Sequence, residues 1–98
     1  MFVIIWRYSV AESNRDRFEA VYGSDGAWAD LFEKANGYLG TELLRSDTAS
    51  GEYMTVDRWQ SPDDFKRFKR RFDEAYRALD AECESLTESE THLGYFSS

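Results

Sequence analysis

The sequence has little of what disulfide-bonded, metal-binding or membrane proteins depend on. One cysteine, one proline and one histidine occur among its 98 residues, and a single cysteine excludes an internal disulfide. The longest unbroken apolar run, residues 2–6, is far shorter than the roughly 20 residues that a membrane-spanning helix needs. Because no segment of the signal-peptide type is visible, we expect a cytoplasmic protein that does not cross a membrane.

Positive charge is also scarce. Twelve Lys and Arg residues against 19 Asp and Glu residues give a formal net charge of −7. Nucleic acids and anionic membrane surfaces attract clustered positive charge, so neither is an expected partner. The sequence shows no metal-ligand cluster, phosphate-binding glycine loop, Ser-His-Asp order or dinucleotide fingerprint, and we expect no metal, flavin or haem cofactor.

Apolar material is present in quantity. Hydrophobic residues make up 42% and aromatic residues 16% of the chain, which is enough for one small domain over residues 1–98. Alternating or continuous apolar patterns predict four strands, over residues 2–10, 38–45, 52–59 and 92–96. The polar loop 46–51 should join the second and third strands as an antiparallel hairpin.

The first helical region is expected in two pieces. Ser13 or Asn14 is a candidate N-cap for the first piece, which a Gly-Ser-Asp-Gly turn then interrupts. Ser24 or Asp25 is the candidate cap of the second piece, which Asn36-Gly37 would close.

The second helical region is expected as one long amphipathic helix over residues 62–84. Ser61 is a capping serine, and Pro62 stands at the first helical position, where a missing N–H is tolerated. Apolar side chains then recur at helical spacing as far as Cys83. The order β-α-β-β-α-β predicts an α+β, ferredoxin-like fold, with one four-stranded antiparallel sheet and both helical regions on one of its faces.

The other face of this sheet would be left open. Its apolar side chains include Val3, Ile5, Met54, Val56 and Leu93 or its neighbours. Contiguous apolar surface of this kind requires cover, and most soluble oligomers are symmetric assemblies of one chain. We therefore expect a homodimer.

Residues 57–61, Asp-Arg-Trp-Gln-Ser, followed by Phe65 and Phe68, resemble the strand-end motif of the antibiotic biosynthesis monooxygenase family. The segment Gly40-Thr41-Glu42-Leu43 and the Tyr8-x-Val10 pattern of the first strand are similar too, so the resemblance spans nearly the whole chain. It implies a dimeric α/β barrel, in which two sheets pack face to face with the helices outside. Each subunit would then hold a pocket between its sheet and its helices.

Some members of this family oxidise aromatic polyketides or quinols without metal or flavin, because an electron-rich phenolate can itself pass an electron to oxygen. The resemblance therefore implies a cofactor-independent monooxygenase acting on a small aromatic quinol or polyphenol. The competing hypothesis is a non-catalytic dimeric module of the same fold that binds a small molecule or fills a structural role.

The resemblance also compares single positions. Trp59 matches a strand-end tryptophan that lines the pocket in some members. Thr55 and Phe65 stand where polyketide-oxidising members can carry an asparagine and a tyrosine. Haem-degrading members use an asparagine, a tryptophan and a histidine at places held here by Trp6, by Phe68 and by residues near position 78, which implies that the haem ligand is missing.

These residues together predict an aromatic pocket with few polar groups. The floor would be Thr55, Asp57 and Trp59, the walls Trp6 and Tyr8, and the roof Phe65, Phe68 and Phe72 from the long helix. Such walls favour a flat, largely apolar ligand.

Two residues are candidate bases. Burial would raise the pKa of Asp57 and suit it to removing a phenolic proton; in the alternative it is an exposed or ion-paired strand-end residue. His92 is the only histidine, and the alternative is a structural or exposed side chain. For Trp59, too, two hypotheses stand: stacking on a planar substrate, or closing the core at a strand end.

Overall fold

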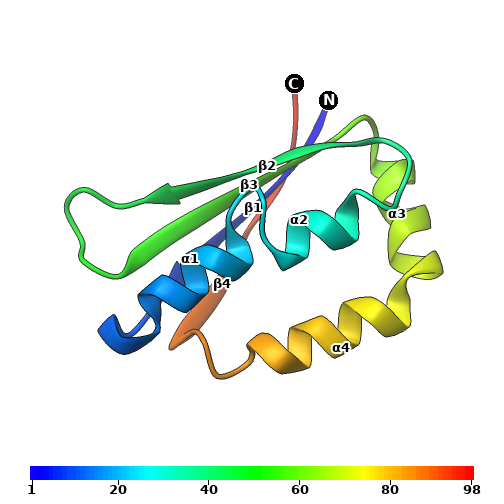
Figure 1. Ribbon diagram of the computed structural model, residues 1–98. Helices are drawn as coiled ribbons and strands as arrows, with labels where there is room; N and C mark the ends of the chain where they lie inside the picture. Colours follow the sequence, from blue (N-terminus) through cyan, green and yellow to red (C-terminus); the bar gives the residue numbers. More distant parts are fainter.

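The computed structural model describes residues 1–98 and shows four helices on one face of a four-stranded antiparallel sheet (Figure 1). The strands are β1 (Phe2–Ser9), β2 (Tyr38–Arg45), β3 (Glu52–Trp59) and β4 (Ser89–Ser97), in the spatial order β2-β3-β1-β4. The helices are α1 (Arg15–Tyr22), α2 (Ala27–Phe32), α3 (Pro62–Arg71) and α4 (Asp73–Cys83), with a 3₁₀ turn at Glu12–Asn14. This arrangement confirms the predicted α+β, ferredoxin-like fold. None of the helices has the length and apolar character of a bilayer span.

The central strands β1 and β3 separate two different faces of the sheet. Phe2 lies opposite Trp59 and Tyr8 opposite Tyr53, all four on the face that the helices cover. At both ends of β1 the side chains at even positions are more buried than those at odd positions, as expected from the alternation of side chains along a strand. The two chain ends meet at one end of β1, where the backbone N–H of Ser98 donates to the carbonyl of Met1.

Trp59 at the end of β3 is the centre of an aromatic core. Its side chain is fully buried, and its ring lies 5.4 to 5.8 Å from those of Phe32, Phe65 and Phe68. Tyr38 closes the same cluster from β2, with its ring 5.3 Å away. Rings at such separations and tilts pack favourably, so this cluster anchors α2 and α3 at the Trp59 end of the sheet.

The helix predicted over residues 62–84 is wrong in one respect, because it is two helices. Phe72 adopts φ −110° and ψ 26°, outside the helical region, and separates α3 from α4. Backbone hydrogen bonds continue across the junction, from Phe72 to Phe68 and from Tyr76 to Phe72. The apolar stripe therefore runs on without interruption, and no proline or glycine marks the bend in the sequence.

The last strand and two caps also differ from their predictions. β4 runs from Ser89 rather than from residue 92, because main-chain pairing with β1 does not require apolar side chains. Neither Asn14 nor Ser24 makes a capping hydrogen bond. The N-cap of α2 is Gly26, whose Cα lies so close to the chain that an added Cβ would stand 2.3 Å from the carbonyl oxygen of Val21. Only a glycine fits that approach.

The predicted cap at Ser61 is confirmed and gives a direct test. Its Oγ accepts a hydrogen bond of 3.2 Å from the backbone N–H of Asp64. We expect Ser61→Ala to lower the free energy of unfolding by about 1 kcal/mol, because an N–H at the start of α3 loses its partner. Ser24→Ala is the matched control and should change it by much less, since Ser24 caps nothing. Equal losses in urea denaturation of the two variants would contradict the assignment.

Candidate functional site

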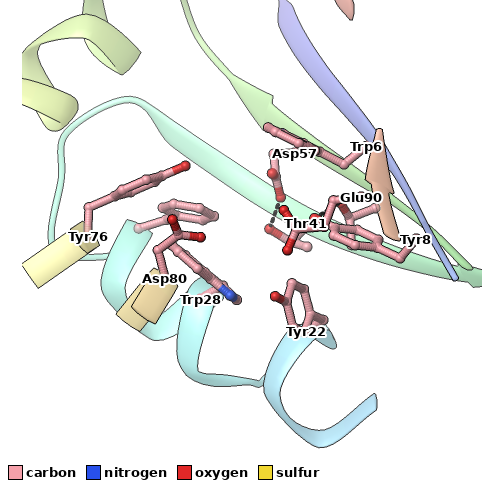
Figure 2. A pocket seen from close by; sticks show the side chains of 11 residues that line it. Trp6, Tyr8, Tyr22, Trp28, Thr41, Asp57, Tyr76, Asp80 and Glu90 are labelled. Atoms are coloured by element: carbon pink, nitrogen blue, oxygen red, sulfur yellow. Dashed lines mark hydrogen bonds between the residues drawn. The ribbon is translucent and has the colours of Figure 1, made fainter. Parts of the chain in front are cut away.

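A cavity lies between the sheet and the helices, next to the Trp59 core (Figure 2). Its empty volume is about 490 Å³, which includes the open space at its mouth, and its interior is narrow. Six aromatic side chains and five polar ones line it: Trp6, Tyr8, Tyr22, Trp28, Phe32, Tyr76, Thr41, Thr55, Asp57, Asp80 and Glu90. These residues come from all four strands and from the helices α1, α2 and α4.

Asp57 is the buried carboxylate of this cavity. It lies two residues before Trp59 on the helix-facing side of β3, and only 9% of it is exposed. Burial raises the pKa of Asp57 to about 6, while a hydrogen bond from Thr41 acts in the opposite direction. No lysine or arginine lies within salt-bridge distance of its carboxylate. With this pKa the carboxyl group of Asp57 can exchange a proton near neutral pH.

A short hydrogen-bond chain orients Asp57. Thr41 lies opposite it on β2, and its Oγ1 donates to Asp57 Oδ1 at 2.7 Å. Because Thr41 gives its proton to Asp57, the hydroxyl of Tyr38 must be the donor in the 2.5 Å contact with Thr41 Oγ1. The chain leaves the second carboxylate oxygen of Asp57 without a protein hydrogen bond.

Phenol groups form much of the remaining polar lining. Burial raises the pKa values of Tyr8, Tyr22 and Tyr76, the last to about 12, so all three stay neutral hydrogen-bond donors at neutral pH. The hydroxyl of Tyr8 accepts from Thr55 at 3.4 Å and keeps its own proton available. The indole N–H of Trp28 is buried beside the Cys83 thiol and has no oxygen or nitrogen partner. An acceptor atom of a ligand in the cavity would satisfy the phenol donors.

The family of antibiotic biosynthesis monooxygenases matches residues 1–82, more than four-fifths of the chain. The chain belongs to this family. No curated protein matches its sequence.

Solved structures show the same fold. An alanine variant of SnoaB, a cofactor-independent oxygenase from Streptomyces nogalater, is 24% identical with a TM-score of 0.72, over 99% of this chain and 91% of that one. A protein from Bordetella bronchiseptica described as an antibiotic biosynthesis monooxygenase is 22% identical with a TM-score of 0.76, over 99% and 95% of the two chains. One from Deinococcus radiodurans reaches the same TM-score at 11% identity, over 100% and 92%. Membership of the family supports a monooxygenase-type function.

Four of the residues predicted for the site line the cavity of this family member. Trp6 and Tyr8 come from β1, Thr55 and Asp57 come from β3, and Trp6 lies directly opposite Thr55 across the two central strands. Figure 2 shows Trp6, Tyr8 and Asp57 on the sheet side of the cavity. Of the two hypotheses for Asp57, the exposed or ion-paired strand end does not describe this structure.

Five predicted residues lie elsewhere. Trp59, Phe65, Phe68 and Phe72 do not line the cavity, because α3 packs directly over the Trp59 end of the sheet and fills that space with aromatic rings. Trp59 thus closes the core. His92 is also outside the lining: it is exposed on the edge strand β4, with its ring 4.9 Å from that of Trp6.

Seven lining residues were not predicted for the site. Tyr22, Trp28, Phe32 and Tyr76 lie at apolar positions of the helical regions, and helical periodicity does not separate a core position from a cavity wall. Thr41 belongs to the segment 40–43 that resembles the family. The pairing of Thr41 with Asp57 across β2 and β3 would have identified it as a site residue. Asp80 and Glu90 carried no local signal, because they lie among other acidic residues.

The burial of Asp57 predicts how stability depends on pH. The folded chain holds the proton of Asp57 up to about pH 6, whereas the unfolded chain loses it near 3.8, so unfolding releases a proton between these values and stability falls as pH rises. We expect Asp57→Asn to be more stable than the parent by about 3 kcal/mol above pH 6 and to lose that advantage below about pH 4. Urea denaturation of both proteins between about pH 4 and pH 7 measures this difference in the free energy of unfolding.

The control for this prediction is Asp47→Asn in the exposed loop between β2 and β3. Its difference from the parent should stay small at both ends of the pH range. An Asp57→Asn variant whose stability runs parallel to that of the parent at all pH values would contradict the buried, proton-binding state of Asp57.

Proposed function

We propose that the chain is a cofactor-independent monooxygenase that oxidises a small phenol or quinol in the cavity beside Asp57. The observation that carries this proposal is the buried Asp57 carboxylate in an aromatic-lined cavity, with no lysine or arginine in the lining. A flat apolar ring fits walls of this kind, and a few polar groups suffice to fix its orientation. The narrow interior favours a molecule of one or two rings.

Asp57 acts as the base in the first step. Its free carboxylate oxygen takes the phenolic proton, and the neutral hydroxyl of Tyr8 stabilises the phenolate oxygen that forms. The electron-rich ring then passes one electron to dioxygen, and the resulting radical pair combines at a ring carbon that bears a hydrogen atom. The peroxide anion formed there takes back the proton held by Asp57 and becomes a hydroperoxide. Loss of water from that carbon leaves a quinone carbonyl, so one oxygen atom stays in the product and the other leaves as water.

Oxygen consumption tests this proposal. A panel of quinols and hydroxyanthracene-type phenols should include at least one substrate whose addition starts oxygen uptake. The rate constant kcat/KM should rise with pH and level off above about pH 6, because Asp57 must be ionised. Asp57→Asn should lower it by about a hundredfold or more, the usual contribution of a general base.

His92→Ala is the control in the same assay, and its activity should stay close to that of the parent because His92 lies outside the cavity. Turnover that survives both substitutions would show that neither residue is the essential base. Absence of turnover across the panel, with binding of the same compounds retained, would favour the non-catalytic binding module instead.

We also propose that two chains associate through the open face of the sheet. Val56 is buried on this face, yet Leu44 is 42% and Phe96 48% exposed in the single chain. Register places Leu44 opposite Met54, and Phe96 opposite Val3, so these apolar side chains form one surface across all four strands. Burial of such a surface is the main driving force for association.

Light scattering at micromolar concentration should give twice the chain mass of 11.4 kDa. Leu44→Glu should give the single-chain mass, because association would bury the new carboxylate without a partner. In the single chain the same carboxylate stays exposed to water, so the variant should still fold. Val56→Glu should split or unfold the dimer. Ala78→Glu, on an exposed position of α4, is the control and should leave the mass unchanged. A parent protein of 11.4 kDa at these concentrations would overturn the proposal.

A further inference from the structure

The cavity opens to solvent between α4 and β4. Asp80 on α4 and Glu90 on β4 line both the cavity and a depression on the outer surface. Both residues are exposed, whereas Asp57 is buried deeper inside. In Figure 2, Asp80 projects from the helix side and Glu90 from the sheet side toward the cavity. A ligand that enters here passes between these two carboxylates.

The charges along this entrance are almost all negative. The outer depression adds Glu84 and Glu88 to the two carboxylates, and its one basic residue, Arg77, is bound to Asp73 at 3.2 Å. The cavity lining contains no lysine or arginine. The Lys69 ammonium stands 3.5 Å from the ring centre of Tyr76, and Lys69 does not line the cavity.

Asp80 and Glu90 act on each other as well. Burial, and after it the negative charge of Asp80, raise the pKa of Glu90. A positive group placed between the two carboxylates would relieve this repulsion and gain attraction from both.

The inner end of the cavity suits a different chemical group of the ligand. The neutral phenol of Tyr8 has a proton to donate, and the second carboxylate oxygen of Asp57 accepts no protein hydrogen bond. Both suit a phenolic hydroxyl group of the ligand. The site therefore matches a molecule with a phenolic oxygen at one end and a positive or uncharged group at the other.

We propose that Asp80 and Glu90 select the substrate by charge, so that the cavity takes phenols bearing an ammonium group in preference to neutral phenols and rejects those bearing a carboxylate. This inference rests on the proposed function only in taking the ligand to be a phenol. Neither residue contributes to proton removal; both determine which molecule reaches Asp57. The net charge of −7 favours the same ligands at long range.

Three phenols of matched size test the inference: tyramine, tyrosol and phloretic acid, which carry an ammonium, a hydroxyl and a carboxylate group on a short chain. Isothermal titration calorimetry without oxygen, at neutral pH and low salt, should rank them in that order of affinity. We expect each change of charge to alter Kd by on the order of tenfold, as carboxylates at a partly solvated mouth would give. Added salt should compress the ranking.

The double variant Asp80→Asn/Glu90→Gln should bring the three Kd values close together. Asp47→Asn/Glu74→Gln changes the net charge equally at positions away from the cavity and should keep the ranking. The inference is overturned if phloretic acid binds as tightly as tyramine, if the ranking survives in the Asp80/Glu90 variant, or if none of the three binds. Because binding is measured without turnover, the absence of oxygenase activity would overturn the proposed function while leaving this ranking intact.

Discussion

The packing of Trp59 fixes where the helices lie, and the rest of the site depends on it. With Trp59 fully buried against Phe32 and Phe68, α2 and α3 are anchored at one end of the sheet. Asp57 stands two residues earlier on the same face of β3, so the same packing carries it under α2 and away from water. Further along the sheet a second aromatic cluster, Tyr8, Phe18, Tyr22 and Tyr53, packs α1 onto the same face, and the cavity lies between the two clusters. A filled core and an open site are thus neighbouring parts of one helix-covered face.

The position of Asp57 is electrostatically unfavourable for folding but suited to proton transfer. Burial without a cationic partner raises its pKa, and the hydrogen bond from Thr41 only partly offsets this effect. A salt bridge would have lowered the pKa of Asp57 and moved its proton exchange away from neutral pH. The Tyr38-Thr41-Asp57 chain instead uses neutral donors, which orient the carboxylate and keep its proton exchangeable near neutrality.

Most of the fold could be predicted from the sequence, and less of the site. Strand and helix patterns and the Ser61-Pro62 start gave the correct order of elements, because burial on one face imposes regular spacing. The bend at Phe72 was invisible, since the apolar stripe continues through it. The cavity depended on which aromatic rings pack tightly, and Phe65 and Trp28 look alike in sequence although only Trp28 lines it. The contact between Thr41 and Asp57 depends on the register of β2 and β3. If Arg45 paired with Glu52, Thr41 would lie opposite Val56. In the observed register Arg45 pairs with Tyr53, and Thr41 lies opposite Asp57.

The acidic entrance depends on an irregularity in β4. From Phe2 to Ile5 the strand pairs continuously, with Ile5 opposite Gly94, but Trp6 then pairs with His92, so Leu93 is an extra residue. Gly94 beside it has φ +149°, a conformation that other residues rarely adopt. Without this bulge Tyr8 would pair with Thr91, and Glu90 would point to the opposite face of the sheet. The extra residue turns Glu90 toward the helices, where it meets Asp80 across the mouth of the cavity.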